Sequence, residues 1–141
     1  MVSDEHPTEL DYAFLASYAE VRDGALTAVS ASYTHLQVAS FPGAHNLFVA
    51  GRIRCSPTAD VELSISVTAP GGIYQFDADY PLEAETYGAQ VYGDPPRVGL
   101  LFAVGGPIPL VAPGDYTVNV LLNGESQREL LFNVAQAEAA G

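Results

Sequence analysis

Apolar and polar residues alternate along much of this chain, and the alternation predicts β-strands. The clearest run is 61–68, in which every second side chain is aliphatic. Successive strand residues point to opposite faces, so this run presents one apolar face to a core and one polar face to water. The same period of two predicts further strands at 12–18, 26–36, 47–55, 74–77, 98–104, 116–122 and 130–134. For 9–19, a short helix remains an alternative by residue propensity.

Turn residues separate these segments. Asp23-Gly24 and Asn123-Gly124 are typical of tight hairpins, because both positions of such turns favour residues that tolerate positive φ. Pro70-Gly71-Gly72 and the glycine pair Gly105-Gly106 are also expected to be turns between strands. Short strands with regular turns indicate an all-β, two-sheet sandwich of about eight strands.

The expected sandwich domain covers residues 11–135. It follows an acidic N-terminal segment, 1–10, and precedes an Ala-rich tail, 136–141. Two long connections fall inside it, at 37–46 and 81–97. Connections of this length are uncommon in small domains and often carry function. The alternative for the second is an ordinary insertion that contains a short edge strand near 89–92.

Charge limits the range of partners. The chain has 141 residues and a net charge of -12, with five arginines and no lysine. A surface of this sign repels phosphate groups, so neither nucleic acid nor anionic membrane is an expected partner. It is either a solvated acidic surface or a docking face for a basic protein. No secretory signal or membrane helix is evident, and Cys55 is the single cysteine, so we expect a cytoplasmic protein.

Residues capable of chemistry are few and scattered. His6, His35 and His45 match no metal-binding spacing, although His35 and His45 together are a minor candidate pair. Cys55 lies on the inward face of its predicted strand, where it would act as a small apolar residue. No nucleophile elbow, phosphate-binding loop or zinc-protease motif is present. We therefore expect no enzymatic activity and no cofactor.

One acidic cluster is the best candidate for a small-ligand site. Asp77 and Asp79 share a strand face, and Glu83 and Glu85 follow in the second long connection, from which they would fold back. Carboxylate oxygens suit calcium or manganese. Nearby tyrosines would also suit a carbohydrate. The alternative is a plain solvated acidic patch.

Two stretches resemble known proteins. The segment 113–125, with its Pro-Gly-Asp-Tyr entry and Asn-Gly-Glu turn, resembles the last hairpin of immunoglobulin-like sandwiches, with Tyr116 as a tyrosine corner. The opening Asp11-Tyr12-Ala13, the Asp23-Gly24 turn and this ending together resemble a family of small uncharacterised bacterial proteins. That resemblance implies an immunoglobulin-like bacterial domain and assigns no functional residue.

The favoured function is a non-enzymatic protein-interaction or assembly module, either an accessory subunit or a self-associating domain of a bacterial cytoplasmic complex. The expected contact residues are Tyr87, Tyr92, Asp94, Phe41, Ile108 and Leu110. The alternative function is a small-ligand module, binding carbohydrate or a divalent cation at the acidic cluster.

Overall fold

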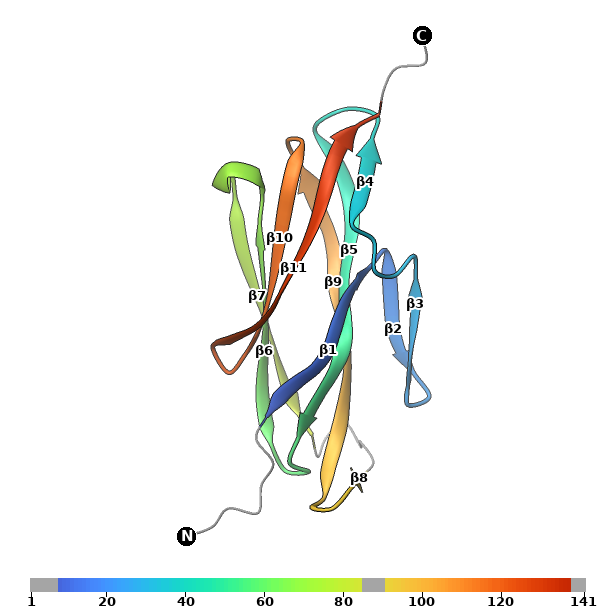
Figure 1. The fold of residues 1–141 in the computed structure, drawn as a ribbon, viewed down its shortest axis with the longest axis vertical. Coiled ribbons are helices and arrows are strands. Elements are labelled where there is room, and N and C mark those ends of the chain that lie inside the picture. The colour runs from blue at the N-terminus through green and yellow to red at the C-terminus, as the bar shows by residue number, and fades with distance from the viewer. Residues whose placement is uncertain (1–7, 85–90, 138–141) are drawn as a thin grey trace.

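Strands make up almost all of the regular structure, as the alternation predicts. The computed structural model describes residues 8–84 and 91–137, and these contain eleven strands and one short 3-10 turn, η1 (Pro70–Gly72). Two sheets lie face to face and run along the long axis of the molecule (Figure 1). No helix in the described residues has the length and apolar character needed to cross a membrane.

The first sheet has four strands, in the spatial order β1 (Glu9–Ala16), β5 (Gly43–Cys55), β9 (Arg97–Leu110) and β8 (Val91–Tyr92). The second has five, in the order β4 (His35–Val38), β11 (Glu125–Gln136), β10 (Gly114–Leu122), β6 (Asp60–Thr68) and β7 (Gln75–Glu83). All neighbours are antiparallel except β4 and β11, which are parallel.

This order is that of an immunoglobulin-like sandwich. Strands β1, β5, β9 and β8 occupy the positions of A, B, E and D, and β11, β10, β6 and β7 those of G, F, C and the additional C′. The first strand is divided between the sheets, because β1 pairs with β5 whereas β4 pairs with β11. The predicted all-β immunoglobulin-like sandwich is confirmed, with eleven strands in the described residues where about eight were expected.

The core lies between the two sheets and is built by the predicted alternation. Leu63, Ile65 and Val67 all point inward and are at most 6% exposed. The rings of Tyr116 and Phe132 stack in the same core with centroids 5.3 Å apart. The buried position predicted for Cys55 is also confirmed, and burial raises the pKa of its thiol.

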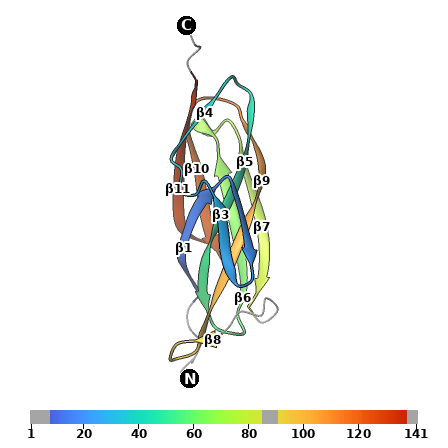
Figure 2. The same ribbon diagram turned by 90° about the vertical axis from the view of Figure 1, so that its right-hand side faces the viewer.

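A hairpin lies outside the sandwich, on the outer face of the first sheet. Its strands, β2 (Tyr18–Arg22) and β3 (Ala25–Val29), pair only with each other in the described residues (Figures 1 and 2). The buried contact beneath it consists of Ala16, Ala19 and Ala50, with Phe14, Leu26, Phe48 and Ala103 around them. Small side chains at the centre allow the hairpin to approach the sheet closely.

The predicted hairpin turns are confirmed. Asp23 and Gly24 have φ of 50° and 75°, and Asn123 and Gly124 have φ of 51° and 84°. The segment 9–16 is a strand and not a helix. The single strand expected at 26–36 is wrong, because Ser30 and Ser32 adopt φ of 52° and 65° and end β3 well before β4 begins.

The turn expected at Gly105-Gly106 is also wrong. Both glycines lie inside β9, where they pair with Phe48 and Leu47 of β5 without a shift in register. A Cβ on Gly105 would collide with the Leu47 carbonyl oxygen and the Phe48 Cα, so glycine there permits a close approach of two backbones.

Candidate protein-interaction site

The two sides of the sandwich differ. One side is closed by β1 and β4, the two parts of the divided first strand. On the other side, which we call the open side, the edge strand β7 of the second sheet faces β9 of the first (Figure 2). In the described residues, β8 covers only the start of β9, pairing with Arg97 and Val98. The rest of β9 therefore has no neighbour on this edge within the described part of the chain.

An apolar cleft of about 180 Å³ lies between the sheets at the open side. Its walls come from β9 and β7, including Val104, Gly106, Ile108, Phe76, Ala78 and Tyr80. Its floor includes Val49 of β5 with Ile65 and Val67 of β6. Phe76, at the mouth, is 40% exposed. Water finds few hydrogen-bond partners in an apolar cavity, so such a cavity favours apolar occupants.

Tyr74 joins the two sheets close to this cleft. Its hydroxyl donates a 2.6 Å hydrogen bond to the carbonyl oxygen of Pro109, which links the start of β7 to the end of β9. Burial, with a smaller effect from neighbouring Tyr116, raises the pKa of Tyr74 to about 12. The hydroxyl therefore stays protonated at neutral pH and remains a donor.

Two of the predicted contact residues are not available at the surface. Ile108 is 4% exposed and Leu110 is 1% exposed, so the outward-facing position expected for these contact residues is not found. Leu110 lies in the core, whereas Ile108 lines the cleft. They alternate with Pro107 and Pro109 in β9, and the prolines rather than the aliphatic residues face outward. Proline has no N–H to donate to a neighbouring strand, so it is tolerated at positions whose amide points away from that strand.

The remaining contact residues are dispersed. Phe41 is half-buried and packs against the core. Tyr92 is 43% exposed in β8, with the Arg97 guanidinium 5.7 Å from its ring centroid, and Asp94 lies exposed in the following turn. Tyr87 lies outside the described residues.

The two long connections are shorter than expected. The connection expected at 37–46 reduces to residues 39–42, because β4 extends to Val38 and β5 begins at Gly43. In the second, β7 continues to Glu83, and the alternative of a short edge strand is supported by β8 at Val91–Tyr92.

The acidic residues are not brought together as expected. Asp77, Asp79 and Glu83 lie along one face of β7, so Asp77 and Glu83 are separated by about 20 Å of extended chain. The expectation that Glu83 folds back is wrong, and Glu85 lies outside the described residues. Asp79 instead accepts a 2.7 Å hydrogen bond from Ser64. No group of three potential metal-ligating side chains occurs among the described residues.

The histidines also remain apart from any such group. His45 lies in β5 and not in a loop, half-buried, with its Nε2 2.7 Å from the Tyr33 hydroxyl oxygen. Burial lowers the pKa of His45. His35 is exposed in β4 beside Thr34, and His6 lies outside the described residues.

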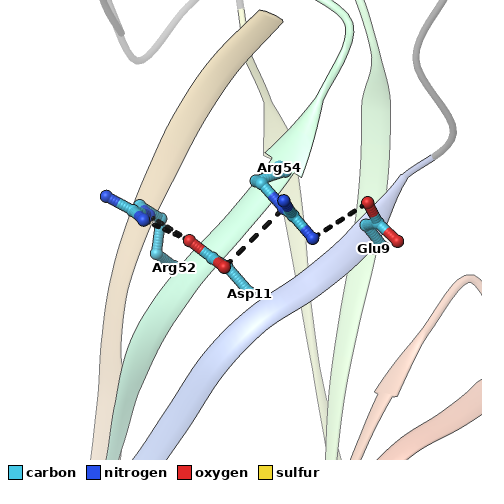
Figure 3. A network of polar contacts seen from close by, with 4 residues as sticks. All are labelled: Glu9, Asp11, Arg52 and Arg54. Atoms are coloured by element: carbon cyan, nitrogen blue, oxygen red, sulfur yellow. Dashed lines mark hydrogen bonds and ion pairs between the residues drawn. The ribbon is translucent and has the colours of Figure 1, made fainter.

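Three arginines gather on the outer face of the first sheet. Asp11 accepts hydrogen bonds from Nε (2.7 Å) and Nη2 of Arg52 and lies 3.7 Å from Nε of Arg54. Glu9 pairs with the other end of the Arg54 guanidinium at 3.0 Å (Figure 3). Arg97 lies nearby on β9, packed on Tyr92. The network ties β1 to β5.

The open side is the feature that the sequence predictions missed. Two signals for it were present in the chain. Pro107 and Pro109 alternate with aliphatic residues, a pattern typical of an edge strand. The glycine pair before them has no side chains to fill the space beside that edge.

Comparison with known proteins gives the family but no activity. The comparison with curated proteins finds no match. Among solved structures, the chain is similar to an immunoglobulin-like protein from Pseudomonas aeruginosa, with 15% sequence identity and a TM-score of 0.46. That match covers 92% of this chain and 98% of the other. The model of a family of unknown function, DUF6941, matches residues 11–135. The predicted membership of an uncharacterised family is thereby confirmed, and the chain belongs to DUF6941.

Proposed function

We propose that this domain is a non-enzymatic protein-interaction module of a bacterial cytoplasmic complex and that its partner binds at the open side. One observation carries the proposal. An apolar cleft opens beside a strand edge that has no neighbour in the described residues from Gly99 to Leu110. Unpaired edges and apolar hollows are the two surface features that most favour association with another chain.

The exposed aromatic residue at the cleft mouth supports this role. Phe76 is 40% exposed, and its ring stacks on Tyr74 with centroids 6.0 Å apart. Aromatic side chains held in place by a neighbour lose little conformational entropy when a partner covers them. A partner at this position would bury Phe76 and the cleft together.

Site-specific crosslinking tests the proposal. A photo-crosslinking residue at position 78, in the cleft, is expected to capture a protein partner in cells of the native organism. The same residue at position 131, where Leu131 is 49% exposed on β11, serves as the matched control. Gly106→Val, which fills the cleft, should prevent crosslinking of the partner to position 78. Equal capture at both positions, or capture that the filled cleft does not change, would contradict the proposal.

A further inference from the structure

The edge of β9 has backbone groups directed toward the open side. β9 pairs with β5 in unbroken register from Val98 to Leu110. In an antiparallel strand, the N–H and C=O of one residue point to the same side, and successive residues alternate. At every second residue of β9, the backbone N–H and C=O therefore point away from β5.

The prolines show which residues those are. Proline has no N–H, so within a sheet it is confined to positions whose amide points away from the neighbouring strand. The backbone carbonyl groups of Pro107 and Pro109 thus point toward the open side. By alternation, so do the N–H and C=O groups of Leu101, Ala103 and Gly105. The hydrogen bond from Tyr74 of the facing sheet to the Pro109 carbonyl oxygen agrees with this direction.

The cleft would receive side chains from a strand placed along this edge. Alternate residues of such a strand point between the sheets, opposite Val104 and Gly106. A Cβ built on Gly106 meets nothing within 4 Å, so this position leaves space for a side chain from the partner. The cleft volume of 180 Å³ equals that of about six water molecules at about 30 Å³ each, enough for aliphatic groups but not for a folded element.

The negative charge of the chain favours some partner segments over others. The chain carries a net charge of -12, so a second copy would be repelled, whereas a basic segment would be attracted. Asp77 and Asp79 are exposed on the outer face of β7, the edge strand beside the cleft, and neither forms an ion pair with a described basic residue. A lysine or arginine beside the inserted segment would gain such a pair.

We infer that the partner contributes an extended, basic-flanked segment that pairs with β9 at Leu101–Gly105 and inserts alternate apolar side chains into the cleft. The segment occupies the position of strand D, which in the described residues is filled at Val91–Tyr92 by β8 and nowhere else. Pro107 and Pro109 supply no donors, so they end the paired stretch and set its register. This inference rests on the proposed interaction at the open side and specifies its form.

Synthetic peptides added to the full chain test it. The probes are seven-residue peptides that alternate threonine with Val, Ile, Leu or Phe, with lysine at both ends. Binding of at least one is expected to slow amide hydrogen exchange at Ala103 and Gly105 at least tenfold. Replacing the terminal lysines by glutamates should weaken binding at least tenfold in low salt, and the difference should shrink as salt is added. Methylating the peptide amides that face β9 should abolish binding, whereas methylating the alternate amides should not.

Two protein variants separate the cleft from the rest of the surface. Ala78→Leu, from β7, and Gly106→Val, from β9, fill the cleft from opposite walls and should abolish peptide binding without lowering the melting temperature. Ala135→Leu, at an exposed position of β11, is the control and should bind as the natural chain does.

Three results would overturn the inference. In the first, no peptide in the series slows exchange at Ala103 and Gly105. In the second, both methylated series bind equally well. In the third, the same protection appears with protein concentration alone, which would identify a second copy as the occupant. If the inference fails while crosslinking at position 78 still captures a partner, the open side remains an interaction site and only strand addition is rejected.

Discussion

The hydroxyl of Tyr116 donates a 3.0 Å hydrogen bond to the carbonyl oxygen of Ala112, four residues earlier in the chain. It also accepts hydrogen bonds from the amides of Val111 (3.0 Å) and Ala112 (3.4 Å), so one side chain bonds three backbone groups at the entry to β10. The ring is fully buried against Phe132. This is the tyrosine corner that the Pro-Gly-Asp-Tyr sequence predicts.

Tyr116→Phe should therefore destabilise the domain by about 1–3 kcal/mol, because part-buried backbone groups of Val111 and Ala112 lose their partner while the ring packing is kept. Equilibrium urea unfolding measures the change. Tyr80→Phe is the control, since Tyr80 is half-buried and no hydrogen bond of its hydroxyl is seen with the described residues. An equal effect of the two substitutions would show that the corner adds no stability.

The adjacent glycines of β9 give a matched pair. Gly105→Ala should cost about 2–4 kcal/mol, because the added methyl group meets the β5 backbone and forces the strands apart. Gly106→Ala should change stability by no more than about 0.5 kcal/mol, since its methyl group enters open space. Urea unfolding of both variants tests this, and similar losses would mean that the close contact of β5 with β9 is not specific to Gly105.

The pH dependence of stability should include a contribution from His45. Burial lowers its pKa below the ordinary 6.5, so the folded state binds this proton less readily than the unfolded chain. The contribution is complete above about pH 6.5 and is lost as the pH falls through the lower, folded-state pKa. His45→Gln retains a partner for Tyr33 without titrating. Its melting temperature should fall less between about pH 7 and pH 5 than that of the natural chain, and an equal fall would contradict the prediction.

The ion pairs between β1 and β5 should contribute a salt-dependent stability. Asp11→Asn is expected to cost about 1 kcal/mol at low salt, because Arg52 and Arg54 both lose a charged partner on a partly exposed surface. The loss should decrease in high salt. Asp77→Asn is the control and should be neutral or slightly stabilising, since it removes one negative charge from a chain with a net charge of -12. Urea unfolding at two salt concentrations distinguishes the variants.

Divalent cations should leave the domain unchanged. The carboxylates of β7 are strung along one strand, so millimolar calcium or manganese is expected to shift the melting temperature by no more than about 1 °C. A larger shift that Asp77→Asn/Asp79→Asn removes would instead support the small-ligand alternative.

Local patterns predicted the parts of this fold that depend on local sequence. The alternation in β6 and β10 predicted both strands and their inward faces. The Asp-Gly and Asn-Gly pairs predicted the β2–β3 and β10–β11 hairpins. The same glycine rule failed at Gly105-Gly106, because there glycine serves contact with β5, a strand about 57 residues away in the chain. Strand pairing at that distance leaves no local pattern.

The open side was missed for the same reason. It depends on which strands lie at the edges of the two sheets: among the described residues, β8 pairs only with the start of β9, and β7 ends the facing sheet. Both are properties of the whole topology. Ile108 and Leu110 were expected to contact a partner, but the sequence does not show that the prolines beside them lie on a strand edge that has no neighbour in the described residues. Nor does it show that the two aliphatic side chains, and not the prolines, face inward.

The divided first strand has a mechanical consequence. β1 begins at one end of the long axis and β11 ends at the other, so a pull on the two ends runs along the strands (Figure 1). Under such a load, β1 must slide along β5, and β11 along both β4 and β10, so the hydrogen bonds of each pair share the force instead of opening one at a time. Placed in series between two tethered partners, the domain would resist tension through shear, from the strands of its closed side.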